Sequence, residues 1–239
     1  MTPTSDAANP PQLDALRALI ARERAEDPLI GPKMGSQVAL DMLLDQLATE
    51  HGVHAETLMA LAGVLVGQSV QACLWAEARQ AGWNRVPGLR VVCCQDDSRY
   101  LVGDPLNRGL MEGYSSPWHL LSEAARQEGC AALPAGEQLL LEGLQRLCTP
   151  AYGHPKVPAA HTPQVLEPGQ QSRLWRLFQP LVAACCQEPK DWPLLCGLVA
   201  ARALRLVQPT LGPELALRLA MDSAIDAAKC PLAEADVLA

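Results

Sequence analysis

Hydrophobic side chains recur at helical spacing through most of this chain of 239 residues. After Ser36, for example, leucines at 40, 43, 44 and 47 form one stripe at i, i+3, i+4 and i+7, and polar residues occupy the other side. The same spacing predicts helices over 13–26, 36–48, 57–80, 117–129, 135–148, 174–185, 191–207 and 213–229. The pattern therefore predicts a mostly α protein, a globular bundle of seven to nine helices around one core.

The stretch 57–76 has no charged residue over twenty positions, which is long enough to cross a bilayer. Polar residues at 68, 69 and 71 interrupt it, and no basic cluster flanks it. We therefore interpret it as a buried central helix of a soluble protein. Gly63 and Gly67, four residues apart, predict a face on which another backbone can approach closely, within the chain or across a dimer.

One segment has the pattern of a small β-hairpin, over residues 89–102. Two short apolar runs, 89–94 and 99–102, flank the turn-forming sequence Gln-Asp-Asp-Ser. Apolar residues fall on both faces, which predicts a ribbon wedged among helices. Glycine and proline predict loops at 31–35 and 103–109.

The segment 149–171 contains five prolines, a density that predicts neither helix nor strand. Residues 1–12 are polar and lack the apolar core of a signal peptide, so they predict a disordered tail. The remainder, 13–239, is expected to form a single α-helical domain. If 149–171 is a linker rather than a docked strap, the chain divides there into two parts.

Composition narrows the class of protein. Hydrophobic residues make up 49% of the chain and charged residues 19%, which excludes global disorder. The acidic net charge of -7, without a cluster of basic residues, argues against a nucleic-acid partner. Fifteen arginines against four lysines are typical of a protein from a GC-rich bacterial genome. The nine cysteines are an odd number scattered through apolar segments, which predicts free thiols and a cytoplasmic location.

Two predicted loops carry side chains that are unusual for passive spacers. A long loop inside a compact domain is usually functional or a linker. We predict a ligand or partner site where these loops meet, formed by Asp104, Asn107, Arg108, Tyr152, His154, Lys156 and His161. The alternative is a strap that packs passively over the helices while its His and Lys side chains are solvated.

Two aspartate pairs suggest an enzyme. Asp41 with Asp45, and Asp222 with Asp226, each place two carboxylates one helical turn apart. Two such helices facing each other could hold Mg²⁺ through oxygen ligands and present it to a diphosphate. This arrangement is similar to the paired aspartate motifs of all-α isoprenoid synthases, and the similarity covers only these two five-residue stretches.

An ordinary structural interpretation competes with the metal site at the second pair. Arg218 lies four residues before Asp222, and Lys229 lies three after Asp226, as in a solvated stripe of alternating charge. Outside the aspartate hypothesis, no cofactor is predicted.

No specific catalytic motif emerges from the chain, so the leading hypothesis is a cytoplasmic interaction or regulatory protein without catalysis. The small-residue face around Gly63 suggests self-association as a homodimer, or a protein partner. Neither nucleic acid nor membrane is an expected partner. The alternative is a Mg²⁺-dependent enzyme that acts on a diphosphate.

Overall fold

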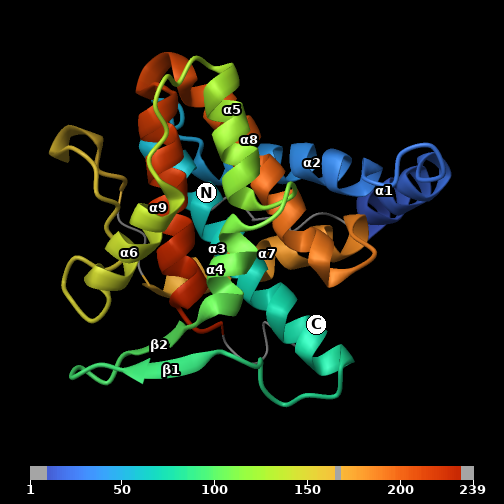
Figure 1. Cartoon of the computed structure of the whole chain (residues 1–239). Coiled ribbons are helices and arrows are strands. Elements are labelled where there is room, and N and C mark those ends of the chain that lie inside the picture. Colours follow the sequence, from blue (N-terminus) through green and yellow to red (C-terminus); the bar gives the residue numbers. More distant parts are fainter. Residues whose placement is uncertain (1–9, 165–167, 233–239) are drawn as a thin grey trace.

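The computed structural model describes residues 10–164 and 168–232, and these form a mostly α globular fold that is 67% helical (Figure 1). Nine α-helices lie in these ranges: α1 (Pro10–Glu23), α2 (Ile30–Leu47), α3 (Ala55–Gln80), α4 (Asp104–Met111), α5 (Pro117–Gln127), α6 (Gly136–Arg146), α7 (Pro168–Cys185), α8 (Trp192–Leu211) and α9 (Pro213–Lys229). The other elements are the strands β1 (Arg90–Cys93) and β2 (Arg99–Val102) and the 3₁₀ turns η1 (Ala159–His161) and η2 (Pro189–Asp191). The predicted fold class is therefore confirmed.

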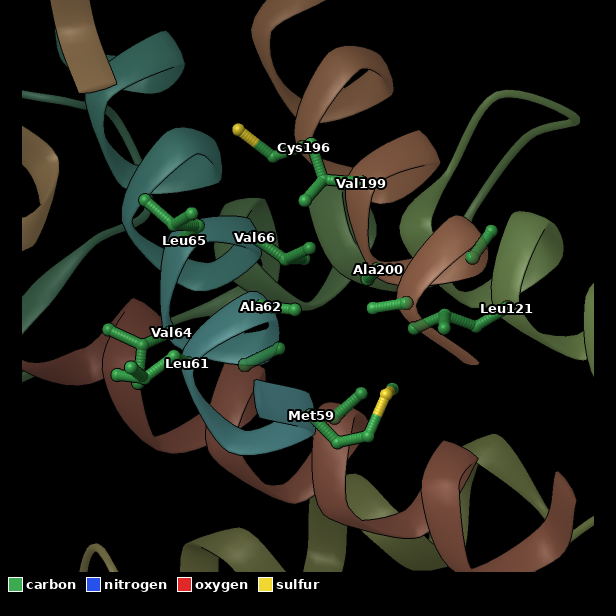
Figure 2. Packing of buried hydrophobic residues seen from close by; sticks show 14 of the residues in the cluster. Met59, Leu61, Ala62, Val64, Leu65, Val66, Leu121, Cys196, Val199 and Ala200 are labelled. Carbon is green, nitrogen blue, oxygen red and sulfur yellow. The ribbon is translucent and has the colours of Figure 1, made fainter. Parts of the chain in front are cut away.

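The core is built around α3, which packs most extensively against α9 and α8 (Figure 1). Figure 2 shows Met59, Ala62 and Val66 of α3 near Val199 of α8 and Leu121 of α5. All of these side chains are buried, and one hydrophobic cluster extends through the helices from α1 to α9. Burial of apolar surface on this scale is the main force that stabilises the fold.

The contact between α3 and α9 depends on the two predicted glycines. A Cβ atom on Gly63 would clash with the carbonyl oxygen of Ala220, and one on Gly67 would lie 2.6 Å from the amide nitrogen of Ala228. The close backbone approach is confirmed, and the helix that makes it belongs to the same chain. Since α9 covers this face, it is not open to a second copy, and a dimer would need another surface.

In the part of the chain that the structure describes, two helical segments are long and apolar enough to span a membrane by length and composition alone. They are Ala55–Gln80 and Pro189–Leu211, and 89% of the most apolar window of the first is buried inside the protein. That burial is what a core helix requires, as predicted for 57–76.

The predicted hairpin is present. β1 and β2 pair antiparallel, with Val91 opposite Leu101 and Val92 opposite Tyr100. Leu101 is buried, whereas Val91 is 58% exposed, so β2 contacts the helices and β1 borders solvent. The expectation of a ribbon wedged among helices is therefore wrong for β1, which is mostly exposed.

The predicted loop at 31–35 is wrong, because α2 begins at Ile30. Gly31 and Gly35 serve close packing instead: a Cβ atom on either would clash with Cys185 of α7. Ser36, the first residue of the helix predicted over 36–48, lies inside α2, where its hydroxyl donates to the carbonyl of Lys33 (2.8 Å). Glycine thus marks a helix–helix contact here rather than a turn.

Three other boundaries differ from the prediction. The predicted loop at 103–109 is mostly helix α4, with Pro105 in its first turn, where proline costs no hydrogen bond. Helix α7 likewise begins at a proline, Pro168, inside the segment expected to hold no helix. The same helix continues past a second proline, Pro180, to Cys185. Helix α1 begins at Pro10, and residues 1–9 of the predicted tail lie outside the described residues.

The expectation of nine free thiols is wrong for two cysteines. Cys94 and Cys148 form a disulfide across a sequence separation of 54 residues. It joins the end of β1 to the segment that follows α6. Sequence spacing cannot reveal such a pairing, because the fold alone brings the two residues together.

Candidate functional site

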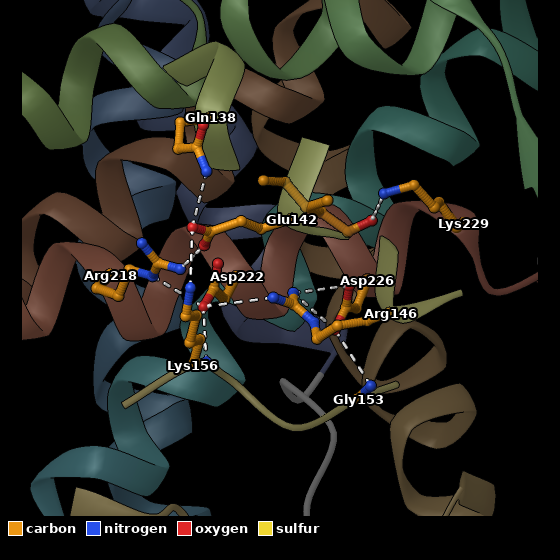
Figure 3. A network of polar contacts seen from close by, with 10 residues as sticks. Gln138, Glu142, Arg146, Gly153, Lys156, Arg218, Asp222, Asp226 and Lys229 are labelled. Atoms are coloured by element: carbon orange, nitrogen blue, oxygen red, sulfur yellow. Dashed lines mark hydrogen bonds and ion pairs between the residues drawn. The ribbon is translucent and has the colours of Figure 1, made fainter. Parts of the chain in front are cut away.

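The proline-rich segment 149–164, called the strap here, is docked on α9 through hydrogen bonds to the second aspartate pair. The hydroxyl of Tyr152 donates to the backbone carbonyl of Asp226 (2.5 Å), and the amide of Gly153 donates to its carboxylate (3.1 Å). The amide of Lys156 donates to the carboxylate of Asp222 (2.8 Å). Figure 3 shows both carboxylates turned toward the strap. The two aspartates therefore satisfy strap backbone groups that would otherwise lack partners.

Arg146, in the last turn of α6, compensates the charge of this pair. Its Nη2 donates to both carboxylate oxygens of Asp226, at 3.1 and 3.2 Å, and its Nη1 lies 3.8 Å from Asp222 (Figure 3). The Asp222 side chain is fully buried, and that of Arg146 is 10% exposed. Charges buried this deeply are tolerated only when they are paired and hydrogen-bonded.

Glu142 extends the network on the outer side of α9. It accepts hydrogen bonds from Gln138 (3.0 Å), Lys156 (3.2 Å) and Arg218, and Arg218 also donates to Asp222 (3.0 Å). Burial raises the pKa of Glu142, but these hydrogen bonds outweigh burial and lower the pKa to about 2. Glu142 therefore remains ionised and joins α6, α9 and the strap.

Burial also dominates the titration of the neighbouring groups. It raises the pKa of Asp226, although Arg146 and Lys229 oppose the rise. It lowers the pKa of Lys229 to about 8, and the Lys229 ammonium donates to the carbonyl of Ile225 (3.1 Å). The prediction of a solvated charge stripe is therefore right about the pairing of Arg218 with Asp222 and wrong about its solvation, since Lys229 is only 6% exposed.

The far end of the strap is bound to the start of α3. His161 Nδ1 lies 2.9 Å from Glu56, whose other oxygen lies 3.3 Å from His54 Nε2. The amide of Gln164 donates to the hydroxyl of Thr57 (3.0 Å). Burial raises the pKa of Glu56, but the hydrogen bond from His161 and the electrostatic effect of His54 and His161 lower it by more, so the net shift of the pKa is downward. The strap is thus anchored at both ends.

Two pockets border the strap, and they divide the four strap residues of the predicted site. Tyr152 and His154 line a cavity of about 70 Å³ between the strap, α3 and α9. Lys156 and His161 line a larger, open pocket of about 730 Å³ beside the start of α9. The small cavity has room for a few water molecules, whereas the larger one is in the size range of ligand sites.

The other three predicted site residues lie on α4. Arg108 lines a separate pocket of about 560 Å³, formed with α3 and the segment between α4 and α5. Asp104, Asn107 and Arg108 line neither pocket of the strap. The structure therefore does not bring the two predicted halves of the site together.

The aspartate pairs are also in different environments. Asp41 and Asp45 are exposed on α2, where Asp41 accepts a hydrogen bond from Gln37 (3.0 Å). Asp222 and Asp226 instead form ion pairs and hydrogen bonds with Arg146, Arg218 and the strap backbone, as described above. Within 10–164 and 168–232, no group of three or more Asp, Glu, His or Cys side chains is placed to hold a metal ion.

Sequence reasoning missed Glu142, Arg146 and Glu56, the partners that make this site. Arg146 and Asp226 are 80 residues apart, and Glu56 and His161 are 105 apart. No local pattern marks such pairs. The one available signal was Arg218, four residues before Asp222 on the same helix.

Comparison with models of protein families, with curated protein sequences and with solved structures found no significant match. Any functional assignment must therefore follow from the geometry of the chain itself.

Proposed function

We propose that this chain is a cytoplasmic interaction protein that self-associates as a homodimer through the outer face of α6. The observation that carries the proposal is a pair of leucines on this helix, Leu141 and Leu144, which are 48% and 52% exposed. Residues three apart on a helix are neighbours on its surface. Exposed apolar neighbours of this kind are typical of contact surfaces.

Charge supports a second copy as the partner. The chain has a net charge of -7, so two copies repel each other unless they meet on an uncharged patch. Gln138 and Gln145 flank the two leucines, and Glu142 on the same helix is turned inward, with its side chain 11% exposed. A twofold axis near Leu144 would therefore bring the leucines and glutamines together and leave the exposed Glu137, one turn before Leu141, at the rim of the contact.

The state of the cysteines supports the proposed compartment. Seven described cysteines are free, and four of these are buried: Cys73, Cys185, Cys186 and Cys196. Buried free thiols are typical of proteins kept in a reducing environment.

Sedimentation equilibrium over a wide concentration range tests the proposal. We expect the native chain to dimerise and the double variant Leu141→Ser/Leu144→Ser to stay monomeric. Leu206→Ser is the matched control, because Leu206 is a 54% exposed leucine on α8; this variant should dimerise like the native chain. A native chain that stays monomeric at all concentrations would refute self-association, and a double variant that still dimerises would refute this interface.

A further inference from the structure

The disulfide between Cys94 and Cys148 lies at the surface. Cys148 is exposed, and Cys94 is half-buried at the end of β1. Their Cα atoms are 5.5 Å apart, within the range that a disulfide spans. Cys148 therefore places one end of the bridge at the solvent boundary.

The other cysteines distinguish this bridge from the structural disulfides of extracellular proteins. Extracellular proteins that rely on disulfides pair most of their cysteines, whereas this chain has seven free ones in the part that the structure describes. Burial raises the pKa of Cys73 to about 12 and that of Cys185 to about 11, so these thiols stay protonated and unreactive. Three other free cysteines, Cys93, Cys130 and Cys230, are exposed or half-buried and are still unpaired. One accessible bridge in a chain that leaves its other described thiols free is the pattern of a reversible redox site.

The bridge holds together segments that have few other contacts. Apart from the disulfide, the hairpin meets the strap through the rings of Tyr100 and Tyr152, whose centroids are 4.4 Å apart. Leu101 is the buried hairpin residue in the hydrophobic core, and Leu89 at the start of the hairpin packs against that core. At the other end of the bridge, Cys148 has φ +59°, a left-handed conformation that is unfavourable for a residue with a side chain. Opening the bridge would release this residue and the turn at 95–98.

We propose that Cys94–Cys148 is a reversible thiol–disulfide exchange site that takes a dithiol reductant and controls whether the hairpin is fixed to the α6–strap junction. A thiolate of the dithiol attacks Sγ of Cys148, the Cys94–Cys148 bond breaks, and Cys94 leaves as a thiolate. The second thiolate of the reductant then attacks the reductant sulfur that is bonded to Sγ of Cys148. The mixed disulfide breaks, and Cys148 leaves as a thiolate. Two electrons and two protons pass to the protein, and the dithiol becomes a disulfide. The exchange does not require the proposed dimer, although Cys148 lies only four residues after Leu144.

The first experiment counts reactive thiols in the folded chain by maleimide labelling and mass spectrometry. After equilibration with an oxidised dithiol and removal of the reagent, Cys94 and Cys148 should be unlabelled. After equilibration with the reduced dithiol, both should be labelled while circular dichroism remains native. A bridge that never forms, or one that opens only when the protein unfolds, would overturn the proposal.

Hydrogen exchange then tests what the bridge controls. Reduction should speed amide exchange in 90–102 and 147–153 by about tenfold or more, since local opening no longer has to overcome the covalent link, and should leave α9 unchanged. The variant Cys94→Ser/Cys148→Ser should exchange like the reduced chain under all conditions. If that variant does not fold, the reduced native chain supplies the same comparison.

Cys93→Ser is the matched control, because Cys93 is an exposed, free neighbour on the same strand. It should keep the redox response of the native chain. Equal exchange rates in the oxidised and reduced native chain would contradict control of the hairpin, and loss of the response in Cys93→Ser would assign the exchange to another cysteine.

Discussion

The two long sides of α9 are built on opposite principles. Toward α3 it presents Ala220 and Ala224, against which Gly63 and Gly67 pack with almost no space between the backbones. Toward α6 and the strap it presents the buried charges of Asp222 and Asp226.

The difference shows what each side contributes. Backbone contact without side chains excludes water and depends on shape, so an added methyl group is enough to disturb it. The charged side gains less net stability, because its desolvation offsets much of the attraction between charges. However, it accepts only partners with matching donors, which explains how an irregular strap is held in one position.

The largest expected effect comes from removing the central cation of the charged side. In Arg146→Met, Asp226 loses both of its guanidinium hydrogen bonds while it stays buried. We expect a loss of about 3–5 kcal/mol in the free energy of unfolding, measured in urea. Arg126→Met is the control: its ion pair with Glu123 is exposed (3.7 Å), and the change should be within about 0.5 kcal/mol. A small effect of Arg146→Met would mean that the network does not stabilise the fold.

The opposite side of α9 should respond to a single added methyl group. In Gly63→Ala the new Cβ meets backbone atoms of Ala220, which can move only if the helices separate. We expect about 3 kcal/mol of destabilisation, despite the better helix propensity of alanine. Gly136→Ala is the control, because its Cβ would lie 3.4 Å from Met111, an ordinary contact. Equal urea midpoints for the two variants would contradict the close packing.

Acid should weaken the charged side selectively. Because the pKa of Glu142 is lowered in the folded state, from 4.5 to about 2, its contribution is complete above pH 4.5 and is lost as the pH falls toward 2. Glu142→Gln should cost about 2 kcal/mol at neutral pH, and the difference from the native chain should shrink over that window. Glu137→Gln, on the exposed side of the same helix, should show neither effect. If the difference in unfolding free energy between Glu142→Gln and the native chain does not vary with pH, ionisation of Glu142 is not the source of the stabilisation.

The smallest effect concerns the strap itself. Tyr152→Phe keeps the ring contact with Tyr100 and removes the hydrogen bond to the carbonyl of Asp226 (2.5 Å). We expect a loss of about 1 kcal/mol and faster proteolysis within the strap. Tyr114→Phe should change nothing, since Tyr114 is 87% exposed. Unchanged proteolysis in Tyr152→Phe would show that the strap is held by its other contacts.

Local patterns in the sequence predicted the helical class, the hairpin at 89–102 and the close contact at Gly63 and Gly67. They misassigned glycine at Gly31 and Gly35, because a turn and a tight helix contact both favour this residue. They also identified the strap and its four polar side chains, but not that these line two separate pockets.

The sequence by itself therefore determined most of the helical segments and which of their faces are apolar, since both follow from residues within a few positions of each other. Only the tertiary structure decided that Arg146 meets Asp226, that His161 meets Glu56 and that Cys94 meets Cys148. These contacts join residues 80, 105 and 54 positions apart, and they form only after the helices have packed. The residues around a charge or a thiol in the sequence do not indicate its partner. Hydrophobic burial decides how the helices pack, and this packing decides which polar side chains and thiols come within reach of each other.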